Sequence, residues 1–241
     1  YKVYQQQYSL SAGVAQALAP DLRFRIGPVV KYASTDLDRV TLLEQVRPYG
    51  SSTFGMVGGQ ASIEFDSRNA TSAATAGVRL AAGGSVYPRA WDVQSTFGEA
   101  HGEASAYLTA KIPARPTLAL RAGATKVWGS YPFFEAAFVG GSSTVRGLRE
   151  HRYIGDAAAW GNAELRLDLG RYYVVLPGSW GLLGVADAGR VWLAGESSDT
   201  WHHGFGGGLW FAPLARSNTV SAVVARSEGR TGFYFRGGFM F

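Results

Sequence analysis

One arginine in this sequence clearly requires a charged partner, because it lies in a stretch that is otherwise glycine-rich and apolar. Arg146 falls within residues 129–155, a connection of about 27 residues that is too long for an ordinary turn. The apolar side chains of this connection argue that it packs against the protein: Phe133, Phe134, Phe138, Val139, Val145 and Leu148. A guanidinium inside a packed segment needs a carboxylate partner, since an unpaired buried charge is very costly.

Two acidic residues further along the chain could be that partner. Polar side chains occupy the even-numbered positions of residues 162–168, so Glu164 shares their face of a strand and points inward. Asp187 interrupts an otherwise apolar segment, and an ionised aspartate on an apolar outer face would be costly, so it should point inward too. A planar guanidinium can bind both carboxylates at once. The alternative is that Glu164 and Asp187 are ordinary interior polar residues.

Other chemistry has little support in the sequence. His202 and His203 are adjacent, so on a strand their side chains point in opposite directions and cannot bind one metal ion from the same face. There is no cysteine and no Gly-x-Ser-x-Gly segment. The sequence therefore predicts no enzymatic activity, no catalytic residue, no metal and no cofactor.

Composition narrows the class of protein further. The 241 residues include 32 glycines, 13% aromatic residues and only 17% charged residues, which is untypical of helical and of disordered chains. No apolar run reaches the length of about 18 residues that a transmembrane helix needs. The net charge of +5 is scattered over many segments, so we expect no nucleic-acid partner.

The dominant pattern is alternation of polar and apolar residues over segments of about ten residues. Residues 60–66 are the clearest case, with Gln60, Ser62, Glu64 and Asp66 on one face and Ala61, Ile63 and Phe65 on the other. Periodicity alone fits a soluble sandwich or a membrane barrel. Three features favour the barrel. Many residues on the apolar faces are small, no predicted helix covers the sheet, and the long connections all fall on the same side of it.

The segments add up to about eleven antiparallel strands. After strands near residues 8–14, 22–26 and 60–66 we expect further strands at 77–87, 102–111, 118–128, 159–169, 181–193, 203–211, 218–226 and 233–241. Bacterial single-chain barrels have an even number of strands. We therefore expect about five more strands upstream, so that residues 1–241 are the C-terminal part of a 16-stranded transmembrane β-barrel. The alternative is a 12-stranded barrel with one strand uncounted.

The segment Gly140-Gly-Ser-Ser-Thr-Val-Arg-Gly-Leu148, preceded by Pro132-Phe-Phe-Glu135, resembles the sixth-loop signature of the BamA/TamA-type outer-membrane assembly and secretion superfamily, the bacterial surface antigen barrels. Residues 65–69 are similar to its Asp-x-Arg-Asn turn. The resemblance implies a 16-stranded barrel with the loop inserted in the lumen, commonly preceded by periplasmic POTRA modules, which this chain does not contain. It also implies a structural role for the loop residues Gly140, Gly141, Val145, Gly147 and Leu148, and for Arg146 held by Glu164 and Asp187.

The last segment alternates aromatic residues with small or polar ones and ends on Phe241. With Phe235 and Phe239 it resembles the C-terminal signal by which outer-membrane barrels are recognised by the barrel assembly machinery. This resemblance implies that machinery as a partner during biogenesis, outer-membrane lipids as surroundings and the bacterial outer membrane as location.

Three functions fit these observations. The first is insertion or translocation of client polypeptides at the outer membrane. The second is service as translocator and anchor of a larger secreted or surface polypeptide, such as a fused hydrolase. The third is a plain diffusion pore, which a loop filling the lumen disfavours. The sequence makes no prediction of the oligomeric state.

Overall fold

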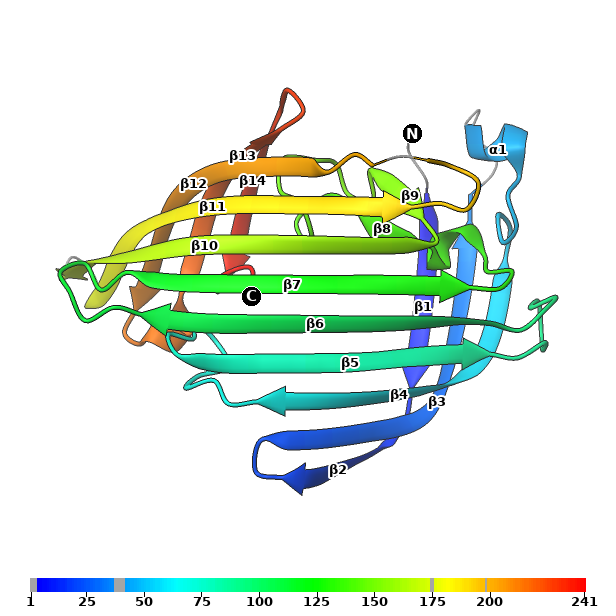
Figure 1. Ribbon diagram of the computed structural model, residues 1–241, viewed down its shortest axis with the longest axis horizontal. Helices are drawn as coiled ribbons and strands as arrows, with labels where there is room; N and C mark the ends of the chain where they lie inside the picture. Colours follow the sequence, from blue (N-terminus) through cyan, green and yellow to red (C-terminus); the bar gives the residue numbers. More distant parts are fainter. Residues whose placement is uncertain (1–3, 37–41, 174–175, 198) are drawn as a thin grey trace. The chain divides into compact units, whose positions relative to one another are not determined.

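The computed structural model describes residues 4–36, 42–173, 176–197 and 199–241, and these are almost entirely β-structure (Figure 1). One sheet contains 12 strands, and a second contains two short ones. None of the helices among these residues has the length and apolarity needed to cross a membrane. The contacts divide the chain into two compact units, which are Tyr1–Glu64, Ala81–Gly102 and Thr125–Ala137 in the first, and Phe65–Leu80, Glu103–Ala124 and Phe138–Phe241 in the second.

The large sheet follows the order of the chain, because consecutive strands are neighbours joined by turns. Its order is β1, β3, β4, β5, β6, β7, β10, β11, β12, β13, β14, with β2 paired to β3. The bounds are β1 Gln5–Ser11, β2 Val14–Ala19, β3 Leu22–Thr35, β4 Phe54–Asp66, β5 Gly77–Tyr87, β6 Phe97–Thr109, β7 Thr117–Trp128, β10 Ala157–Tyr172, β11 Gly178–Trp192, β12 His202–Pro213, β13 Val220–Ser227 and β14 Arg230–Gly237. The short strands β8 Ala137–Val139 and β9 Tyr153–Gly155 form the second sheet.

The strand count differs from the predicted eleven because the first strand is interrupted. β1 and β2 both pair antiparallel with β3, on either side of a break at Ala12 and Gly13. At this break a side chain on Gly27 would overlap the Ala12 backbone, so glycine permits the close approach of the two strands. The helix α1, Leu42–Val46, was not predicted and lies in the polar connection after β3.

The first unit has its own apolar core beside this connection. Buried residues of β3 to β6 and of the β5–β6 loop form it: Val29, Phe54, Met56, Tyr87, Val93 and Phe97. The beginning of the long β7–β10 connection joins this core through Phe134, whose ring meets Phe54 edge-on. Lys31 donates hydrogen bonds of 2.8 and 2.9 Å to the Glu135 carboxylate. The start of the connection is therefore packed, as its aromatic residues predicted.

In the second unit, β10 to β14 have one buried face and one exposed face. We call the first the loop-covered face, because residues 138–156 lie on it. Its apolar part contains Leu183, Val185, Trp210, Ala212, Val223, Ala225 and Phe239. The opposite, exposed face carries large apolar side chains such as Leu165, Leu182, Leu209 and Phe233. A sheet in a soluble protein buries its apolar face. The exposed apolar face of β10 to β14 is therefore stable only in an apolar environment.

The C-terminal segment departs from the sequence-based prediction of a strand running to Phe241. β14 ends at Gly237, and Gly238 has a φ of +86°, a left-handed conformation that favours glycine. The chain then turns onto the loop-covered face, where Phe239 is only 7% exposed and packs against Trp210. Phe235, by contrast, is 80% exposed on the opposite face. The prediction is wrong for this end because alternation of aromatic residues does not show where a strand stops.

Candidate functional site

Residues 138–156 form a compact loop with its own hydrogen bonds. β8 and β9 pair at its base, and the Gly140 N–H donates to the Thr144 hydroxyl at 2.7 Å. The Ser142 N–H donates to the Glu150 carboxylate at 2.7 Å. Gly140 and Gly141 have positive φ angles of 130° and 87°, which explains why glycine occupies both positions. These bonds fix the backbone that presents Arg146.

The loop lies directly on β11 and β12. Val145 is fully buried, and Leu148 nearly so. A side chain on Gly189 would come within 2.8 Å of methyl groups of Val139 and Val145, so this strand position must stay small. Gly147 has a φ of +94°, and a Cβ there would lie 2.5 Å from the Ser227 backbone nitrogen. The glycines therefore let loop and strand backbones touch.

Arg146 extends from this loop into a buried ion-pair network. Its Nε and Nη2 each lie 2.7 Å from one oxygen of Asp187, a bidentate contact. Its Nη1 lies 2.7 Å from Oε1 of Glu164. The Arg146 backbone N–H also donates to Asp187 at 3.0 Å. Arg146 and Asp187 are each 3% exposed and Glu164 is 0% exposed, so water does not screen these contacts.

A second arginine, Arg166, balances the charge of the network. Its Nε and Nη2 lie 3.0 and 2.7 Å from Oε2 of Glu164, whose other oxygen binds Arg146. Its Nη2 also donates to the Phe241 carbonyl at 2.9 Å, and its guanidinium lies 3.9 Å from the Phe239 ring centroid. The network thus contains two cations and two anions. Sequence reasoning assigned Arg166 no role, although its even-numbered position beside Glu164 marks it as inward-facing.

Asn162 completes the set of polar groups around Asp187. Its side-chain amide donates to Asp187 Oδ1 at 2.8 Å and to the Thr144 carbonyl at 2.6 Å. In the β10–β11 register Asn162 is paired with Asp187, which places both on the loop-covered face. The amide therefore connects the strand pair to the loop backbone next to Arg146.

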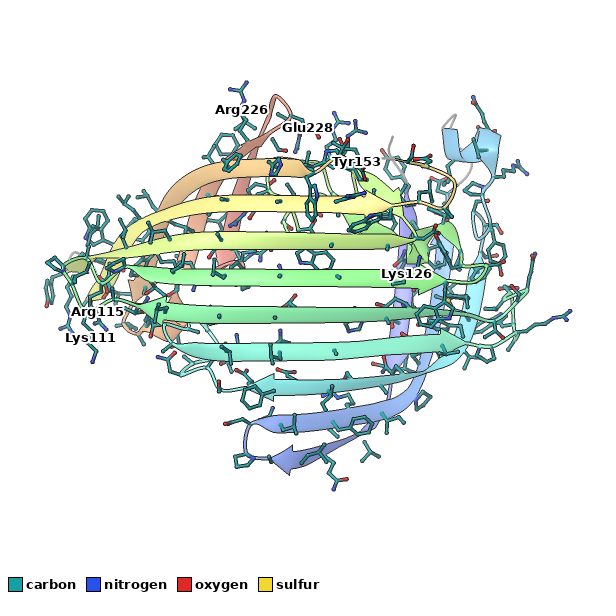
Figure 2. The ribbon with its side chains drawn as sticks, viewed as in Figure 1. Lys111, Arg115, Lys126, Tyr153, Arg226 and Glu228 are labelled. Carbon is teal, nitrogen blue, oxygen red and sulfur yellow. The ribbon has the colours of Figure 1, made fainter. Side chains whose placement is uncertain are left out.

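The loop has a second, more exposed attachment to the β13–β14 hairpin. The Tyr153 hydroxyl donates to Glu228 at 2.7 and 2.8 Å, and the His202 ring contacts the same carboxylate at 2.6 Å. Figure 2 shows Tyr153 and Glu228 together at this end of the strands. The Tyr153 and His202 rings stack with centroids 3.6 Å apart, whereas the neighbouring His203 stacks on Phe205.

The contact between Tyr153 and Glu228 reinforces the ordinary protonation state of each group at neutral pH. Partial desolvation, followed by the hydrogen bond to Glu228, raises the pKa of Tyr153 to about 12. Partial desolvation would raise the pKa of Glu228, but hydrogen bonds from Tyr153 and His202 outweigh it, so this pKa lies below its usual value. At neutral pH the tyrosine is therefore a donor and the glutamate an acceptor.

The buried network joins the loop to β10 and β11. All four charged side chains are paired, and within the described ranges no group of three or more His, Asp or Glu side chains is placed to bind a metal ion. The structure brings Arg146, Gly147, Glu164 and Asp187 together with the loop residues Val145 and Leu148. Phe239 and Phe241 both contact Arg166 on the loop-covered face, whereas Phe235 lies on the opposite face.

Comparison with known proteins shows the fold. No protein-family model matches the chain, and neither does any curated protein sequence. Among solved structures, the chain is similar to BamA from Haemophilus ducreyi lacking POTRA domains 1–3, with a TM-score of 0.70 and 13% sequence identity. The likeness covers 97% of this chain and 54% of the BamA chain, so the chain spans about half the length of that protein.

This likeness confirms the predicted all-β fold of the BamA barrel type, with one large antiparallel sheet. The class that fold and site define is therefore a BamA-type barrel fold whose long loop is held on one face by buried ion pairs. At 13% identity the shared property is the fold, and activity has to be argued from the residues themselves.

Proposed function

We propose that the chain is the barrel portion of a bacterial outer-membrane protein that inserts or translocates polypeptides, with the loop at residues 138–156 held inside the lumen. The observation that carries this proposal is Arg146 bound to Asp187 and Glu164 beneath the loop. Outer-membrane lipids would surround the exposed face, and client or passenger polypeptides would be the partners. No catalytic role is assigned to any residue.

The exposed face supports the membrane location. Leu165, Leu182 and Phe233 stand on it without cover from other described parts of the second unit, and lipid is the solvent that such side chains favour. The loop-covered face instead bears charged residues, as the lumen side of a membrane barrel does. Phe235, on the exposed face near the C-terminus, would be available to the barrel assembly machinery during biogenesis.

The network supports a specific, non-porin role. Removing one partner from a buried ion pair costs about 3–5 kcal/mol, so the loop has one strongly preferred position. A plain diffusion pore gains nothing from a loop fixed across its lumen. A barrel that handles polypeptides benefits from a closed resting state that keeps ions and small solutes from leaking.

The test uses the full-length protein in planar bilayers and in a client-insertion or secretion assay. We expect small, flickering conductance for the intact protein, because the packed loop excludes water. Deletion of residues 140–150 should give larger, steadier conductance steps and abolish insertion or secretion. Arg149→Ala, an exposed change in the same loop, is the matched control and should leave both readouts unchanged.

Two results would contradict the proposal. If the intact protein already conducts like an open porin, the loop does not close the lumen and a simple pore is the better description. If the deletion retains full insertion or secretion activity, the barrel is an anchor for another part of the polypeptide.

A further inference from the structure

The exposed face of the second unit carries a shallow apolar groove of about 660 Å³. Its floor is formed by short side chains on neighbouring strands, among them Ala122, Ala163 and Ala186. Larger side chains, including Leu120 and Phe205, line it as well. Because alanine methyl groups project less than leucine or phenylalanine side chains, the floor lies below its rim. A hollow of this kind fits an unbranched hydrocarbon chain lying along the surface.

A free cation stands beside this groove. Arg226 on β13 is paired with Phe205 in the β12–β13 register, and directly paired residues share a face of the sheet. Its side chain is exposed, and no hydrogen bond or ion pair joins it to any described residue. Glu228, two residues further along the chain, is already bound to Tyr153 and His202. Figure 2 shows Arg226 and Glu228 on the same β13–β14 hairpin.

His203 adds a second polar group to the groove itself. It lines the hollow two residues from Phe205, and its ring makes no hydrogen bond with the described residues. A neutral imidazole carries one N–H and a charged one carries two, so a donor is present in either state. The apolar hollow therefore has one imidazole in its lining, and one guanidinium beside Phe205 at its edge.

An uncompensated arginine on a lipid-facing strand is unfavourable unless it finds an anion. Arginine binds phosphate through two parallel N–H donors, which makes a lipid phosphate the best-matched anion in a membrane. Arg226 lies two residues before Glu228 in the β13–β14 turn, where strand and headgroup region would meet. Tyr153 ties this turn to the long loop, so both lie on the same side of the membrane.

We propose that the groove, Arg226 and His203 form a binding site for lipid A, the phosphorylated and multiply acylated lipid of the outer leaflet. One acyl chain lies along the alanine floor, and one phosphate is bound by Arg226 with His203 as a second donor. This inference rests on the proposed function, because it requires the long-loop end of the barrel to face outward, as long barrel loops do. That orientation selects lipid A over the glycerophospholipids of the inner leaflet.

The experiment is native mass spectrometry of the full-length, delipidated protein in detergent, titrated with three probes. These are bis-phosphorylated lipid A, the same lipid with its phosphates removed, and phosphatidylglycerol. We expect phosphorylated lipid A to bind at least tenfold more tightly than either other probe. Arg226→Gln should abolish this preference, and Ala163→Leu, which fills the floor, should weaken the binding of all acylated probes.

Lys111→Gln is the matched control. Lys111 is also an exposed cation without a partner among the described residues, but it lies at the β6–β7 turn, at the opposite end of the strands from Arg226 (Figure 2). This variant should bind lipid A as the original protein does. Arg226→Lys should retain part of the preference, and each variant should first show the heat-modifiable gel band of a folded barrel.

The outcomes separate the two proposals. Equal binding of lipid A and phosphatidylglycerol, or unchanged lipid A binding by Arg226→Gln, would overturn the lipid site while leaving the barrel function intact. A chain that remains in the aqueous fraction of cells and binds none of the probes would instead refute the membrane location on which both depend.

Discussion

The long loop is attached to the sheet in two places that differ in burial and in chemistry. Under the loop, Arg146 and Asp187 are each 3% exposed and are joined by a bidentate contact. At the hairpin, Tyr153 and Glu228 meet near the surface, through hydrogen bonds that involve one charge. Burial excludes water and ions from the first attachment, whereas they reach the second. The buried attachment should fix the loop, and the exposed one should only adjust it.

The largest expected effect comes from removing the loop's cation. Arg146→Ala leaves Asp187 buried without its main partner, which costs about 3–5 kcal/mol and should lower the temperature at which the folded gel band is lost. Asp187→Asn should have a smaller effect of the same kind. The double variant should lose much less than the sum of the two, because residues of one network are coupled.

The exposed Arg149→Ala variant controls for the loss of any arginine from the loop and should leave the transition unchanged. Additive losses for Arg146→Ala and Asp187→Asn would mean that the two side chains do not depend on each other. The contrast between the two attachments would then rest on burial alone.

An intermediate effect is expected from Arg166, which joins the network to the C-terminus. Arg166→Gln removes the buried ion pair with Glu164, the hydrogen bond to the Phe241 carbonyl and the contact with Phe239, while Glu164 stays bound to Arg146. The cost should lie near the lower end of the about 3–5 kcal/mol lost when one partner of a buried ion pair is removed, because Glu164 keeps Arg146 as a second cation. Chymotrypsin should cleave after Phe239 faster in this variant, while the loop stays in place.

Arg171→Gln, an exposed change near the end of the same strand, is the control for this experiment. If cleavage after Phe239 is no faster in the Arg166→Gln variant than in the original protein, packing of Phe239 against Trp210 holds this segment without the arginine.

The difference between the two attachments also explains what the sequence could predict. Period-two alternation places Glu164 and Asp187 on the same face as any inward cation, so their candidacy as partners of Arg146 follows from strand parity. Parity says nothing about which side chains meet once the chain turns. The contact between Arg166 and Phe241 depends on the turn that the left-handed conformation at Gly238 produces. The alternation of aromatic residues in the sequence would be the same without that turn, so it could not predict the contact.

The exposed attachment was beyond sequence reasoning for a related reason. Tyr153, His202 and Glu228 come from a loop, a strand and a hairpin, and no spacing links them. Likewise, the break between β1 and β2 depends on the close approach of Gly27 to Ala12, which is a property of the strand pair and of neither segment alone. Local pattern predicted strands and faces, and tertiary contacts decided ends and partners.

The smallest effect should come from the exposed attachment, and it should depend on pH. The pKa of Glu228 is below its ordinary value of 4.5 in the folded protein, so its contribution is complete above that pH and is lost as pH falls further. The pKa of Tyr153 is raised from 10.0 to about 12, so its contribution is complete below pH 10 and is lost between these values. The contact should therefore weaken at both extremes, by less than about 1 kcal/mol at such an exposed position.

A spin label can report this small change, because the chain has no cysteine and one introduced at Arg149 would be the only one. Label mobility should be constant between about pH 5 and 9 and should rise modestly beyond either limit. Glu228→Gln should raise mobility at neutral pH and remove the acid step, Tyr153→Phe should remove the alkaline step, and Glu196→Gln, an exposed control, should change neither. A large rise in mobility for Glu228→Gln at neutral pH, comparable to that of Arg146→Ala, would show that the exposed attachment holds the loop and that the buried network does not suffice.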